Sequence, residues 1–80
     1  MIVKILGSGC KKCVALADNA KAAAQAAGID AEIEKVTDIV AIAGYGIMST
    51  PGLVIDEKVV SSGRVLAPAE IAPLLQEARQ

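Results

Sequence analysis

Cys10 and Cys13 are the residues of this sequence whose type and spacing could do chemistry. Lys11 and Lys12 stand between them, and the chain contains no histidine. Two cysteines at positions i and i+3 of a helix start can bring their sulfur atoms within reach of a disulfide bond. Such a dithiol can exchange two electrons with a partner, because a mixed disulfide formed at one sulfur is resolved by the other.

The expected surroundings of the pair favour a reactive thiolate at Cys10. An apolar strand over residues 2–6 and a glycine-rich loop precede it, and a helix is predicted directly after it. The positive end of the helix dipole and the charges of Lys11 and Lys12 should lower the pKa of the Cys10 thiol. Cys13 falls on the apolar face of the predicted helix and should be the more buried of the two. We therefore expect Cys10 to attack and Cys13 to resolve.

The remaining sequence predicts the elements that position this pair. Apolar residues recur at three- and four-residue steps over 11–27, and Gly28 suits the left-handed residue that ends a helix. The order β-α-β-α-β-β-α follows, an α/β chain without internal repeats. The strands are predicted at residues 2–6, 31–36, 53–55 and 58–60, and the helices at 11–27, 38–43 and 68–79.

For three of these elements the sequence also predicts burial, capping or a local distortion. Strand 2–6 is expected to be buried on both faces. In the short helix, Thr37 is expected as the N-cap and Asp38 as an acidic residue of the first turn, with Ile39, Ile42 and Ala43 on one side. Pro73 falls inside the last helix if that helix begins at Pro68, so a late start or a distorted first turn is expected.

Composition and charge limit the partners. The chain has 80 residues, a net charge of −1 and one aromatic residue, Tyr45. These values predict a single domain over residues 1–80 with neither the basic surface nor the stacking platform that nucleic acid needs. No signal peptide or apolar span long enough for a membrane is present, which predicts a cytoplasmic protein. A reducing cytoplasm favours catalytic or metal-binding cysteines over a permanent disulfide.

The sequence resembles the thioredoxin superfamily, and within it the small thioredoxin-like or glutaredoxin-like redox-active disulfide proteins of bacteria and archaea. The resemblance covers nearly the whole chain. Three segments carry it: Gly9-Cys10-Lys11-Lys12-Cys13, Met48-Ser49-Thr50-Pro51-Gly52-Leu53-Val54-Ile55 and Ser62-Gly63-Arg64.

The resemblance implies a minimal thioredoxin fold, a four-stranded mixed sheet flanked by three helices, and the activity of a thiol-disulfide oxidoreductase. It implies that Thr50–Pro51 is a cis peptide bond facing the dithiol, and that Thr50, Pro51 and Gly63 contact an extended substrate. Protein disulfides and an upstream reductase, for which a thioredoxin-reductase type is one candidate, are the implied partners. No organic or metal cofactor is expected, because the dithiol itself carries the electrons.

Other interpretations of the same residues stay open. Paired thiolates after a first strand also suit Cu(I), so a soft-metal binding or transfer protein is the alternative function. A structural zinc site needs about four ligands, and a monomer with two cysteines and no histidine cannot supply them. The two cysteines could also be inert core residues. Tyr45 could be a wall beside the dithiol or an ordinary packing residue.

Overall fold

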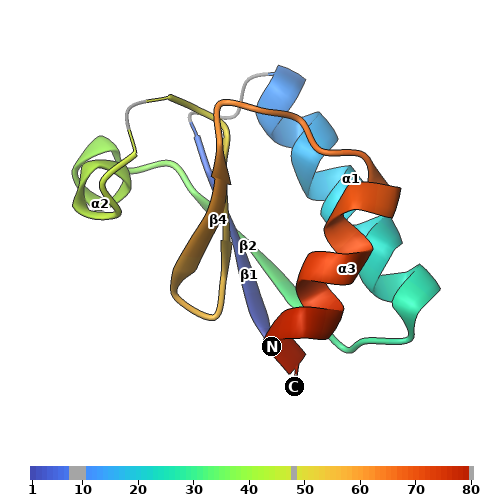
Figure 1. Cartoon of the computed structure of the whole chain (residues 1–80). Helices are drawn as coiled ribbons and strands as arrows, with labels where there is room; N and C mark the ends of the chain where they lie inside the picture. The colour runs from blue at the N-terminus through green and yellow to red at the C-terminus, as the bar shows by residue number, and fades with distance from the viewer. Residues whose placement is uncertain (8–10, 48, 80) are drawn as a thin grey trace.

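The computed structural model describes residues 1–7, 11–47 and 49–79. Within these ranges the chain forms three helices and one four-stranded mixed sheet, in the order predicted from the sequence (Figure 1). The strands are β1 (Ile2–Leu6), β2 (Glu32–Val36), β3 (Gly52–Ile55) and β4 (Lys58–Ser62). The helices are α1 (Lys11–Ala27), α2 (Ile39–Gly44) and α3 (Pro68–Arg79).

The strand order β2-β1-β3-β4 places β1 and β3 in the middle of the sheet. β1 runs parallel to β2 and antiparallel to β3, and β3 and β4 form an antiparallel hairpin. In the β1–β3 register, Leu6 lies opposite Gly52. The end of β1, where the chain leads toward the cysteines, therefore lies beside Pro51 at the start of β3.

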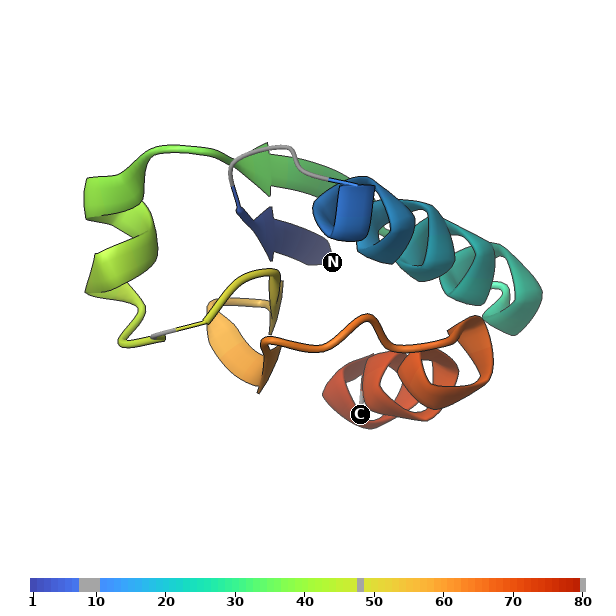
Figure 2. The ribbon, with the colours of Figure 1, turned by 90° about the horizontal axis from the view of Figure 1, so that it is seen from above.

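Helices α1 and α3 cover one face of the sheet, and α2 lies on the other (Figure 2). The larger core forms under α1 and α3 and is built from branched aliphatic side chains of the strands together with the alanine face of α1. The small alanine side chains allow close packing of α1 against its neighbours. The fully buried large residues of this core are Val3, Ile5, Leu16, Leu53, Ile55, Ile71 and Leu75.

The opposite face has a small core made by Leu6, Ile42 and Val54. The expectation for α2 is wrong in part: Ile42 is buried, whereas Ile39 is 78% exposed and Ala43 is also exposed. A helix of six residues contacts the sheet through only one turn. The N-cap of α2 is Asp38 and not Thr37 as expected, because the Asp38 carboxylate accepts a hydrogen bond from the Val40 N–H at 3.1 Å.

β1 is buried on both faces only at its end, because Lys4 replaces an apolar residue on the α2 side. β3 is the strand whose four residues are all buried. Of the two outcomes expected for Pro73, the late start is wrong, since α3 begins at Pro68 and contains Pro73. In its first turn the Ala67 carbonyl accepts from both the Glu70 and Ile71 N–H groups. None of the helices over the described residues is long and apolar enough to cross a bilayer.

Candidate functional site

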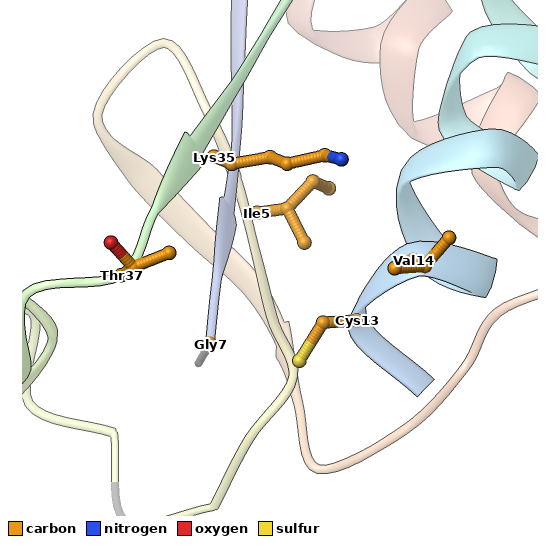
Figure 3. A pocket seen from close by; sticks show the side chains of 6 residues that line it. All are labelled: Ile5, Gly7, Cys13, Val14, Lys35 and Thr37. Atoms are coloured by element: carbon orange, nitrogen blue, oxygen red, sulfur yellow. The ribbon is translucent and has the colours of Figure 1, made fainter. Parts of the chain in front are cut away.

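Cys13 lies in the first turn of α1, on the face that packs against the sheet. Cys13 is 5% exposed, which agrees with its expected place on the apolar face of the helix. The turn projects Sγ toward the end of β1, where Gly7 follows Leu6 (Figure 3). Cys10, the expected nucleophile, lies outside the described residues. Lys11 and Lys12 are exposed at the helix start.

Gly7 and Pro51 lie next to the Cys13 side chain. A methyl group at the Cβ position of Gly7 would overlap Sγ of Cys13 and would lie 3.4 Å from its Cβ. The same methyl group would lie 3.9 Å from Cα of Pro51. The Cys13 sulfur and Pro51 thus both lie beside the position that a side chain at Gly7 would occupy.

The Thr50–Pro51 peptide bond is cis, and Pro51 is fully buried while Thr50 is exposed. The Pro51 carbonyl accepts a hydrogen bond of 2.8 Å from the Gly63 N–H. Gly63 has φ +72°, and a Cβ there would lie 2.9 Å from Cβ of Ser49. Gly63 therefore braces the loop that carries Pro51, in a conformation and a space that favour glycine.

A small cavity opens beside the Cys13 side chain. Its volume of about 20 Å³ is enough for roughly one water molecule. Figure 3 shows the Lys35 side chain extending across Ile5 toward α1, with Thr37 at the end of β2. The cavity is lined by Ile5, Gly7, Cys13, Val14, Lys35 and Thr37.

Tyr45 lies on the α2 side of the sheet and belongs to the core around Leu6, Ile42 and Val54. Its hydroxyl accepts a hydrogen bond of 3.0 Å from the Lys4 ammonium and donates one of 3.0 Å to Glu57. These contacts favour the interpretation of Tyr45 as a packing residue, and the described residues that line the Cys13 cavity do not include it.

Lys4 and Glu57 form an ion pair within the same cluster. The hydrogen bond to Glu57 is the main cause that raises the pKa of Lys4 above its ordinary value, with a further contribution from Tyr45. The hydrogen bond from Lys4 is likewise the main cause that lowers the pKa of the Glu57 carboxyl. This cluster joins β1, α2 and the β3–β4 turn on the side of the sheet away from α1.

The structure places Pro51 near Cys13, and it places Thr50 and Gly63 next to Pro51. Sequence reasoning missed three residues that line the cavity beside Cys13: Gly7, Lys35 and Thr37. Gly7 was expected only as part of a turn. The parallel register, in which Ile5 lies opposite Lys35, is the signal that could have placed Lys35 near the cysteine helix.

Comparisons with known proteins point to one family. The family model described as a thioredoxin domain matches residues 1–76. A thioredoxin of Methanocaldococcus jannaschii is 41% identical over 71 residues, covering 89% of this chain and 81% of that protein. A thioredoxin of Methanothermobacter thermautotrophicus is 39% identical over 75 residues, covering 94% of this chain and 97% of that protein.

The sheet order, the helix that presents Cys13 and the proline loop beside it define a thioredoxin-like α/β protein. With the family match over nearly the whole chain, the protein belongs to the thioredoxin family and has its minimal fold. Membership supports a thioredoxin-like redox role.

Proposed function

We propose that this protein is a thiol-disulfide oxidoreductase that exchanges electrons with protein disulfides through Cys10 and Cys13. The observation that carries the proposal is the place of Cys13: buried in the first turn of α1, beside Pro51, with a second cysteine three residues earlier in the sequence. A cysteine three residues from the first sulfur, at the start of the same helix, can resolve a mixed disulfide formed there. Family membership supports the same conclusion.

In the proposed reaction, the Cys10 thiolate attacks one sulfur of a substrate disulfide. A bond forms between Cys10 and that sulfur, the substrate S–S bond breaks, and the leaving sulfur takes up a proton. Cys13 then loses its proton and attacks Sγ of Cys10, which releases the second substrate thiol. Two electrons have passed to the substrate, and the protein ends with a Cys10–Cys13 disulfide that a reductase returns to the dithiol.

The other residues of the site have supporting roles in this proposal. Lys11 and Lys12 stabilise the Cys10 thiolate by their charge. Thr50 and the exposed edge of the Pro51 loop receive an extended segment of substrate. The Gly63 N–H is already donated to the Pro51 carbonyl, so Gly63 would contact a substrate through its Cα or its own carbonyl. No resident cofactor is required, because the two sulfur atoms carry the electrons.

The proposed partners are protein disulfides and an upstream reductase, in the cytoplasm. Neither nucleic acid nor a membrane is a proposed partner, since the chain carries a net charge of −1 and a single aromatic residue. The named relatives, both thioredoxins, support protein substrates and a reductase as the general class of partner.

The test uses insulin as a disulfide-bonded model substrate. We expect the reduced wild-type protein to reduce it, and Cys13→Ser to accumulate a protein–insulin adduct linked through Cys10 that dithiothreitol releases. The matched control, Cys10→Ser with Cys13→Ser, should form no adduct. Absence of both turnover and adduct would contradict the proposal. Tight Cu(I) binding that needs both cysteines, without any adduct, would instead support the soft-metal alternative.

A further inference from the structure

Gly7 occupies a position where the structure leaves no room for a side chain. It follows the last residue of β1, and a Cβ added there would overlap Sγ of Cys13. The other two nearest atoms lie at ordinary or nearly ordinary contact distances, 3.4 Å for Cβ of Cys13 and 3.9 Å for Cα of Pro51. The sulfur is therefore the atom that fills the space of the missing side chain.

The backbone of Gly7 does not itself require glycine. Its φ lies outside the left-handed region, unlike that of Gly28 or Gly63. The Gly7 N–H donates to the Val36 carbonyl at 2.9 Å, which continues the pairing of β1 with β2. An alanine could adopt this backbone, so the demand for glycine comes from the space that the Cys13 sulfur needs.

We propose that Gly7 is a positioning residue that seats the thiol of Cys13 against the end of β1, beside Pro51. A disulfide forms only within narrow limits of Cβ separation and dihedral angle. A methyl group at position 7 would turn Sγ out of its seat and change the direction from which it reaches a neighbouring sulfur. We call the space beside Gly7 that holds Sγ of Cys13 the seat. The effect of Gly7 on electron exchange rests on the proposed function, whereas the packing of the sulfur in this seat does not.

A double-mutant cycle on the reduced protein tests the seat without any redox chemistry. The variants are Gly7→Ala, Cys13→Ala and the two combined, with urea unfolding as the measurement. Overpacking by one methyl group predicts that Gly7→Ala lowers the folding equilibrium constant about tenfold or more. In the Cys13→Ala background, which lacks Sγ, the same change should cost little. Gly44→Ala is the matched control, because a Cβ at Gly44 meets no atom within 4 Å.

The outcomes of the cycle separate the explanations. An equal loss with and without Sγ would overturn the proposal, because Gly7 would then serve the backbone alone. No loss in either background would overturn it as well. If Gly7→Ala fails to fold while the combined variant folds, the seat is supported; if both fail to fold, it is overturned.

A second measurement tests the consequence for exchange. Oxidised glutathione is mixed with the reduced protein, and the rate at which Cys13 displaces glutathione from Cys10 is followed by acid quenching and mass spectrometry. We expect Gly7→Ala to slow this step about tenfold or more, and Gly44→Ala to leave it unchanged. An unchanged rate in Gly7→Ala would remove the positioning role. If the wild-type protein forms no disulfide at all but the stability cycle shows coupling, the proposed function fails and the seat stands.

Discussion

At the scale of single residues, the structure shows Cys13 as a buried thiol in the first turn of α1. Cys13 is 5% exposed, and its sulfur fills the space beside Gly7. Cys10 is expected to carry the reactive thiolate, because the helix start and two lysines lower the pKa of a thiol placed there. We therefore expect Cys10 to act as the attacking sulfur and Cys13 as the resolving one.

This difference predicts the order of alkylation. In the reduced wild-type protein, iodoacetamide at neutral pH should modify Cys10 before Cys13, because alkylation needs an accessible thiolate. Peptide mapping after short reaction times measures the order, and the single variants Cys10→Ser and Cys13→Ser give the separate rates. Equal rates at the two cysteines would contradict the assignment.

The Lys4, Tyr45 and Glu57 cluster predicts a pH dependence of stability. The pKa of Glu57 is lowered in the folded protein, so its contribution is complete above the ordinary value of 4.5 and is lost as the pH falls through the lowered pKa. The pKa of Lys4 is raised, so its contribution is present below 10.5 and is lost as the pH rises through the raised value.

Glu57→Gln should therefore flatten the fall in unfolding free energy on the acid side, while Glu77→Gln, an exposed change of the same charge on α3, serves as control. Urea unfolding at a series of pH values between 2 and 6 measures this slope. An acid-side slope in Glu57→Gln equal to that of the wild type would contradict the role of the cluster.

At the scale of elements, the end of α1 depends on a glycine. Gly28 has φ +68°, and its N–H and that of Ile29 bond back to the carbonyls of Gln25 and Ala24. This arrangement is a helix C-terminal motif in which the left-handed residue is usually glycine. The buried Ile29 side chain then packs against the main core.

Gly28→Ala should lower the free energy of unfolding by about 1–2 kcal/mol, the usual cost of a left-handed non-glycine residue. A Cβ at Gly28 meets no atom within 4 Å, so the loss reports the backbone conformation alone. Gly44→Ala lies within α2, where alanine is the better helix former, and should be neutral or stabilising. Equal effects of the two changes on urea unfolding would contradict this explanation.

The elements also show how far the sequence predicted the structure. Hydrophobic periodicity and helix-ending residues located the strands and helices. These signals are local: Gly28 ends α1, and the apolar face of α1 repeats every three or four residues. The prediction for α2 was wrong at Ile39, which is exposed. A helix that contacts the sheet through a single turn has too few buried positions to produce a clear hydrophobic periodicity. The Lys4–Tyr45 and Lys4–Glu57 contacts join residues 41 and 53 positions apart and depend on the packed sheet. The contact between Gly7 and Cys13 was not predicted from the sequence, because it depends on how α1 packs against the end of β1.

At the scale of the whole molecule, the core under α1 and α3 and the smaller core under α2 share one sheet. Leu53 and Ile55 of β3 belong to the first core, and Val54 belongs to the second. A strand that contributes to both cores couples them, so loss of one should destabilise the other. Figure 1 shows the start of β1 and the end of α3 near one another at one end of the sheet, and Gly7 follows Leu6 at the other end of β1.

This coupling predicts a single unfolding transition. Tyr45 is the one aromatic residue, so its fluorescence reports the α2 side, while far-UV circular dichroism reports all elements. The two urea curves should coincide in the wild type. Leu16→Ala, which empties a fully buried site of the main core, should shift both curves together by about 2–5 kcal/mol. A shift seen by circular dichroism alone would indicate two independent units.

The redox equilibrium of the protein with glutathione tests most directly whether Cys10 and Cys13 act together as one redox-active dithiol. After equilibration in buffers of graded potential, acid quenching and mass spectrometry count the free thiols. We expect both thiols to be lost together in one intramolecular disulfide, as a two-electron couple with a midpoint between about −270 and −180 mV. Lys11→Gln with Lys12→Gln should lower this midpoint, because the reduced state loses stabilisation of its thiolate, while Lys21→Gln should not. Separate glutathione adducts on Cys10 and Cys13, without a disulfide between them at any potential, would contradict the proposed dithiol exchange.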